Sequence, residues 1–312
     1  MTKTRFLYID IARVIAMLWI VGWWHLIQYS KVGEDSYHFI GDNSITMLML
    51  GLFMFLSGFL IGKKSLKTKE EIKSFYKSRF WRFYILYALS VITFPILTGF
   101  NREISIIITT LTATSPYILP QPVTLWFLSM LAGFYLITPL VKRNIAIGGG
   151  ILIIFVLLHI LLPEGIDTRV FVYFPLYVFG LFSSEYSFID KITQKKIVIP
   201  VSLILSLLLY MGAIYYEWFV YLFIPTGIIF VLSISRLLEY ININKFISVL
   251  SYSSLCVYLF HRQIYQIVYG VLRRIGFNDL FVLLLVALPL CICFSWFIQK
   301  IYDSLLKRFK II

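Results

Sequence analysis

The chain has 312 residues, of which 60% are hydrophobic and only 14% are charged, and its formal net charge is +13. A soluble domain of this length needs more polar surface than this composition supplies, so we predict one polytopic membrane domain without a separate soluble module. Lys and Arg concentrate in alternate loops, above all in residues 63–82, which is the positive-inside pattern of membrane proteins and argues against nucleic acid as a partner. The same asymmetry suggests attraction to anionic lipid or to an anionic cytosolic ligand.

We predict an all-α bundle of about ten transmembrane helices that forms a single domain over residues 1–312, with both termini in the cytosol. The basic segment 63–82 is expected to form an amphipathic helix on the inner surface. Residues 100–124 are interpreted as a half-inserted or peripheral outer segment, because ISIIITTLTA is short for a span; full crossing by 104–119 would give eleven spans. The predicted helices occupy residues 9–30, 44–62, 83–99, 125–141, 146–162, 170–184, 197–215, 219–236, 246–269 and 280–299.

Two ionisable side chains, Arg13 and His25, interrupt the apolar first helix. A charge in hydrocarbon is costly unless it is paired or faces a wet cavity, so both residues are functional candidates. The alternative is that Arg13 snorkels to the interface and that His25 makes a hydrogen bond between helices. The two residues would lie about 18 Å apart along the helix axis. A ligand that reaches both needs an anionic head on a long thin arm, and the phosphopantetheine thioester of an acyl-CoA has this shape.

Arg79 and Arg82 stand three residues apart at the entry to the third predicted helix, where they would share one face. This pair suits an anion site, and it equally suits ordinary positive-inside anchoring. Ser57 in FLSGF lacks the GxSxG pattern of an activated nucleophile, so close helix packing is its default explanation.

Tyr258, His261 and Arg262 lie on the helix predicted at 246–269, and the last two need partners near mid-membrane. A structural hydrogen bond and a substrate contact are both open for them. His38 and His159 are assigned to loop and packing roles. The histidines show no metal-ligand spacing, so we expect no metal site.

Five segments occur in order along the chain: YIDIARVIAM…H, FMFLSGFLIGK, SRFWRFY, LWFLSMLAGFYLITPL and SYSSLCVYLFH. They resemble the LDxLRGIA…H, FFxLSGFL, RxxRxxP, LWFL…FYLLxPL and SYxIYLxH motifs of the acyltransferase 3 family, integral membrane proteins that O-acylate sugars of cell-surface polysaccharides and related glycoconjugates. The resemblance implies a cytosolic acyl-CoA donor, a hydroxyl of a polysaccharide or lipid-linked glycan as acceptor on the far side, and a multi-pass protein of the plasma (inner) membrane.

The resemblance also implies residue roles. His25 corresponds to the family's catalytic histidine and Arg13 to its essential arginine, while Arg79 and Arg82 correspond to the arginines that we assign to donor binding. Other residues within the matched motifs are possible substrate-site residues: Ser57, Trp126, Tyr258 and His261.

The chain departs from the family pattern in several places. Eleven residues separate Arg13 from His25 where the family usually has ten, which on a regular helix turns the two side chains about 120° apart instead of about 20°. We predict that an irregular turn, π-like or kinked, within Ile20–His25 absorbs the extra residue and returns His25 to the Arg13 face, with Gly22 as its softest point. Gly51 replaces an acidic residue and Ile85 replaces the proline of RxxRxxP. We expect no fused SGNH esterase-like domain, and leave open whether a partner protein completes the transfer.

The predicted function is transfer of an acyl group, expected to be acetyl, from acyl-CoA to a glycan hydroxyl, with no bound cofactor. His25 would act as general base or carry the acyl group briefly, and Arg13, Arg79 and Arg82 would hold the donor's phosphates. The main alternative is a transporter or flippase for an anionic lipid-linked sugar that uses the same intramembrane charges. A catalytically inactive membrane scaffold is a weaker third hypothesis.

Overall fold

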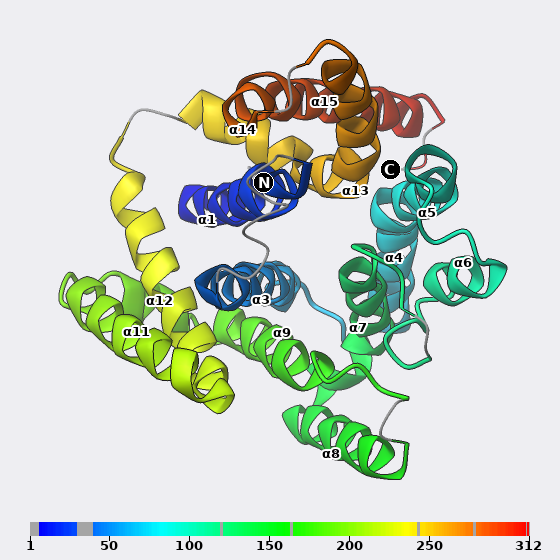
Figure 1. The fold of residues 1–312 in the computed structure, drawn as a ribbon. Helices are drawn as coiled ribbons and strands as arrows, with labels where there is room; N and C mark the ends of the chain where they lie inside the picture. The colour runs from blue at the N-terminus through cyan, green and yellow to red at the C-terminus, as the bar shows by residue number, and fades with distance from the viewer. Residues whose placement is uncertain are drawn as a thin grey trace. The chain divides into compact units, whose positions relative to one another are not determined.

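The computed structural model describes residues 6–29, 40–118, 121–162, 165–241, 244–276, 279–309 and 311. These residues form helices and connecting turns, with no strand among them, which confirms the all-α class (Figure 1). The predicted outer loop with His38 lies outside the described residues.

Six helical stretches in the described part of the chain are long and apolar enough to cross a membrane. The predicted count of about ten and the cytosolic termini therefore stay predictions. Two further apolar helices, Ile145–Leu161 and Val170–Glu185, are shorter. The six candidate spans are Leu7–Tyr29, Asn43–Gly62, Lys69–Thr98, Val198–Tyr215, Glu217–Leu238 and Leu280–Arg308.

The chain folds as two compact units, and the single functional domain predicted for residues 1–312 stays a prediction. Unit 1 contains Met1–Leu56 and Tyr186–Gln299, and unit 2 contains Ser57–Glu185 and Lys300–Ile312. Two of the boundaries fall inside continuous helices, α3 (Ile40–Gly62) and α15 (Leu288–Arg308).

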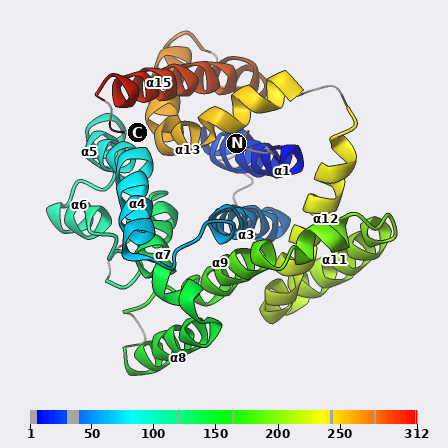
Figure 2. The ribbon, with the colours of Figure 1, turned by 180° about the vertical axis from the view of Figure 1, so that it is seen from behind.

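Unit 1 is built around α1, which packs against α12 and α13 (Figures 1 and 2). Ala12, Ala16 and Met17 of α1 are fully buried, as expected for a helix that is apolar on nearly all sides. The helices of this unit are α1 (Leu7–Met17), a π-helix (Leu18–His25), a 3₁₀ turn (Ile27–Tyr29), the first part of α3, α10 (Phe188–Thr193), α11 (Val198–Tyr215), a 3₁₀ turn (Glu217–Phe219), α12 (Val220–Leu238), α13 (Asn244–Arg274), α14 (Leu280–Val282), a π-helix (Leu283–Ala287) and most of α15.

Unit 2 contains α4 (Lys69–Arg79), a π-helix (Phe80–Tyr84), α5 (Ile85–Thr98), α6 (Ile104–Leu111), α7 (Trp126–Arg143), α8 (Ile145–Leu161) and α9 (Val170–Glu185). The eight residues of α6 rise about 12 Å, too little to cross the hydrocarbon core, so the structure does not support the eleven-span alternative. Lys142 on α7 donates to the Gly62 carbonyl at 2.5 Å and to the Lys64 carbonyl, and thus places a positive charge at the C-terminus of α3.

The basic segment and the third predicted helix are continuous, which corrects the expectation of a separate surface helix. A capping box starts α4: Thr68 accepts from the Glu71 N–H at 3.2 Å, and the Glu71 carboxylate accepts from the Thr68 N–H at 3.0 Å. The helix then passes through the π segment into α5, where the Ile85 N–H donates to the Phe80 carbonyl. The proline of the family pattern has no N–H to donate at this position, so Ile85 favours the unbroken helix.

Candidate functional site

The first helix changes from α to π geometry at Leu18, and the π segment ends at His25. The irregular turn predicted within Ile20–His25 is therefore confirmed. A π turn holds an extra residue and disturbs the regular hydrogen-bond ladder. The Tyr265 hydroxyl of α13 donates to the Val21 carbonyl inside this segment at 3.1 Å, and so braces the turn from the neighbouring helix.

Two imidazoles meet beside the π turn. Nδ1 of His25 lies 2.7 Å from Nε2 of His261, and both rings are buried, with 7% and 1% of their surface exposed. The two ring planes are nearly parallel, at 6°, and the ring centroids lie 4.7 Å apart. His261 was predicted as a possible substrate-site residue, and the structure gives it this direct contact with His25.

The hydrogen-bond chain assigns the tautomers of both rings when both are neutral. Nδ1 of His261 lies 2.7 Å from the Tyr258 carbonyl oxygen, which only accepts, so this Nδ1 carries the proton. Nε2 of His261 is then the acceptor, and His25 donates to it from Nδ1. Nε2 of His25 therefore keeps its lone pair, and it makes no hydrogen bond within the described part of the chain. A neutral imidazole with one bare nitrogen is able to take a proton from a hydroxyl group.

A cation stands near the histidine pair. Arg262 directly follows His261 in α13, and its positive charge acts on His25 and on the Tyr29 hydroxyl. Its Nε is buried and has no hydrogen-bond partner among the described residues. The Tyr265 ring also borders the site, and its centroid lies 5.8 Å from the ring centroids of both His261 and Tyr29. The site thus combines a buried imidazole pair, a buried cationic N–H donor and an aromatic wall.

Arg13 belongs to a second polar cluster between α1 and α13. Its Nη1 donates to the Ser251 hydroxyl at 3.2 Å and lies 3.7 Å from the Asp10 carboxylate. Ser251 in turn donates to Asp10 at 2.5 Å. The charge of Arg13 is therefore balanced by a buried carboxylate, so the ordinary snorkelling explanation is not needed.

Arg13 and His25 both contact α13, through Ser251 and His261. These two partners stand ten residues apart, which corresponds to about 15 Å along a helix. This spacing agrees with the approximately 18 Å expected along the first helix. Asp10 was not among the predicted site residues, although its i,i+3 spacing to Arg13 is a recognisable helix ion-pair signal.

Arg79 and Arg82 of unit 2 stand at the junction of α4 and the π segment. Arg79 is half-buried, and its guanidinium lies 5.6 Å from the centre of the Phe75 ring and 4.7 Å from that of the Tyr135 ring. Its Nε is buried without a hydrogen-bond partner in the described residues. Arg82 is exposed. Arg79 therefore retains a buried donor for an anion, whereas Arg82 faces outward.

Trp126 begins α7, and Arg169 and Tyr173 cover its ring. The Arg169 guanidinium lies 3.4 Å from the ring centre and pairs with Asp167 at 2.7 Å, while the Tyr173 ring stacks at 6.1 Å. The indole is thus held between two neighbours and half-buried, and its role as a possible substrate-site residue stays a prediction.

Ser57 is half-buried on α3, one residue before a close helix contact. A Cβ at Gly58 would collide with the Tyr177 carbonyl of α9, and one at Gly62 with the Leu181 carbonyl. The G-x-x-x-G spacing thus lets the α3 and α9 backbones approach closely, which is the packing explanation given for FLSGF. His159 packs edge to face on Phe171 at 5.4 Å, as expected for its packing role.

Comparison with known proteins adds one finding to this geometry. No curated protein and no solved structure matches the chain. The family model described as an acyltransferase domain matches residues 6–300, which is nearly the whole chain. It includes both the histidine pair and the Arg79–Arg82 region. The chain therefore belongs to the acyltransferase 3 family of membrane acyltransferases.

Proposed function

We propose that this membrane acyltransferase transfers an acyl group, expected to be acetyl, from cytosolic acyl-CoA to a hydroxyl of a polysaccharide or lipid-linked glycan, and that His25 is its general base. The observation that carries this proposal is the hydrogen-bond chain from the Tyr258 carbonyl through His261 to His25. Because this chain fixes the proton on Nδ1 of His25, it leaves Nε2 ready to accept a proton.

In the proposed step, Nε2 of His25 takes the proton of the acceptor hydroxyl while the hydroxyl oxygen attacks the thioester carbonyl. The carbon–sulfur bond then breaks, the CoA thiolate leaves, and the proton held by His25 neutralises the sulfur. His261 does not touch substrate in this scheme. It is a positioning residue, because it holds one tautomer and one ring orientation of His25.

Arg262 is proposed to stabilise the negative oxygen that develops on the thioester carbonyl. Its buried Nε has no partner among the described residues, and its charge already acts on His25. A cationic donor held ready at a site of developing charge lowers the barrier because little reorganisation is needed.

Arg79 and Arg82 are proposed to bind the phosphates of the donor, and the buried, unpartnered Nε of Arg79 supports this role. For Arg13 we propose a more structural contribution than the sequence suggested. Its pairing with Asp10 and Ser251 connects α1 to α13, and so keeps the π turn against His261.

The rival function, transport or flipping of an anionic lipid-linked sugar, also uses intramembrane charges. Family membership favours acyl transfer over it. Labelled acetyl-CoA added to inside-out vesicles separates the two. Protein-dependent release of free CoA, together with label in a glycan fraction, is expected for the transferase. Movement of the lipid-linked sugar without thioester loss would overturn the proposal.

A further inference from the structure

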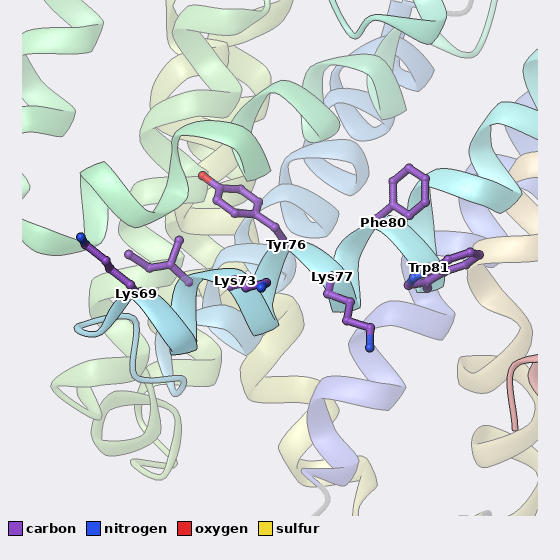
Figure 3. Close-up of a pocket in the computed structure, with 7 residues that line it drawn as sticks. Lys69, Lys73, Tyr76, Lys77, Phe80 and Trp81 are labelled. Carbon is purple, nitrogen blue, oxygen red and sulfur yellow. The ribbon is translucent and has the colours of Figure 1, made fainter. Parts of the chain in front are cut away.

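Three lysines form a cationic stripe on α4. Lys69, Lys73 and Lys77 are spaced four residues apart, so they share one helix face, and all three are exposed (Figure 3). No carboxylate forms an ion pair with them in the described part of the chain. Glu71 of the same helix is occupied by the capping box and by Ser65. We refer to these three residues as the α4 lysine face.

The α4 lysine face borders an open groove of about 590 Å³ whose other lining residues are Ile72, Tyr76, Phe80 and Trp81. The Tyr76 hydroxyl is engaged, because it donates to the Leu136 carbonyl at 2.7 Å. Phe80 is 45% exposed. The groove therefore offers ammonium groups at its edge and apolar or aromatic surface elsewhere, which matches an amphiphile with an anionic head.

The same continuous helix carries an apolar surface beyond the groove. Leu89, Ile92 and Ile96 are 47%, 52% and 72% exposed, as expected for residues that face lipid. From Lys77 to Ile96 the helix rises about 28 Å, close to the roughly 30 Å of a hydrocarbon core. When the apolar part spans that core, Lys77 lies at headgroup level and Phe80 and Trp81 lie where interfacial aromatic residues gather.

We propose that the α4 lysine face is a binding site for an anionic phospholipid of the surrounding bilayer, with its phosphate beside Lys73 and Lys77 and its acyl chains against Phe80 and Trp81. Clusters of basic residues next to a transmembrane helix attract anionic lipid in this way. A free nucleotide fits less well, because a groove lined by one helix supplies ammonium groups and no polar partners for a base. The site does not depend on the acyl-transfer proposal.

The test uses the purified full-length chain in detergent and two spin-labelled probes, phosphatidylglycerol and phosphatidylcholine. We expect the wild type to bind phosphatidylglycerol more tightly than phosphatidylcholine. Replacement of all three lysines of the α4 lysine face by Gln should weaken phosphatidylglycerol binding by about 10-fold to 100-fold and leave phosphatidylcholine binding unchanged. A matched variant removes the same charge from three exposed lysines of unit 1 and is expected to bind like the wild type: Lys191→Gln, Lys195→Gln and Lys196→Gln.

Equal losses in both triple variants would overturn the proposal, since they would show an effect of net charge alone. Unchanged phosphatidylglycerol binding in the α4 variant would overturn it as well, and loss of CoA binding in its place would assign the groove to a nucleotide. Should the α4 triple variant fail to fold, the single variants Lys73→Gln and Lys191→Gln make the same comparison, with an expected loss of about fivefold for Lys73→Gln only.

Discussion

Replacement of His261 by leucine tests how the second imidazole contributes to catalysis. Leucine cannot accept the hydrogen bond from Nδ1 of His25, which is 2.7 Å long in the structure. A buried N–H without a partner costs about 1–3 kcal/mol, and His25 avoids this cost by moving its proton to Nε2 or by rotating its ring. Either response removes the bare Nε2 that the proposed proton transfer needs. At about 1.4 kcal/mol per tenfold change, we expect His261→Leu to lower kcat roughly 5-fold to 150-fold.

The assay measures initial rates of CoA release from labelled acetyl-CoA in vesicles, normalised to the amount of folded protein. Because His261 is proposed not to touch substrate, KM for acetyl-CoA should stay near the wild-type value. The matched variant His261→Gln places an amide oxygen within reach of Nδ1 and should recover part of the rate. A wild-type kcat in His261→Leu, or a His261→Gln variant no faster than His261→Leu, would refute the positioning role.

Three other predictions concern different parts of the chain. Arg79→Gln and Arg82→Gln should raise KM for acetyl-CoA more than they lower kcat, and an unchanged KM in both would leave these arginines as topological anchors. Arg262→Gln should lower kcat by about 10²-fold to 10³-fold with little change in KM, whereas a kcat within threefold of wild type would exclude it as the oxyanion donor. Gly58→Ala should lower the thermal unfolding midpoint in detergent, because the new alanine Cβ would collide with the Tyr177 carbonyl. The control Gly150→Ala should not lower it, because a Cβ at Gly150 meets open space. Equal midpoints in the two variants would contradict the close contact between α3 and α9.

The π turn was predictable from the sequence together with the family resemblance, because eleven intervening residues in place of the usual ten put Arg13 and His25 on different faces of a regular helix. Gly22 marked the place where a regular helix yields most easily, and the structure has π geometry from Leu18 to His25. The spacing of two residues in one helix was sufficient for this prediction, because the departure from α-helical geometry lies within that same helix.

The partner of His25 was not predictable in the same way. His261 is 236 residues away in the sequence, and the residue pattern of α13 does not predict which side chain of the first helix His261 contacts. Asp10 was within reach of sequence reasoning, since it lies three residues before Arg13. The continuity of α4 with α5 was missed because a basic amphipathic pattern was read as a surface helix, although Ile85 in place of proline permits a continuous helix.

The measurement that tests the central claim most directly is acyl transfer by a His25→Ala variant. Wild-type and variant protein are brought to equal abundance in vesicles, and their folding is compared by thermal unfolding, because loss of a buried imidazole also affects packing. Labelled acetyl-CoA is then supplied from the cytosolic side, and label in the glycan fraction is followed. If His25 is the general base, transfer falls by at least about 10²-fold while folded protein stays near the wild-type amount. Transfer within a few fold of wild type in folded His25→Ala protein would contradict the assignment of His25 as the base.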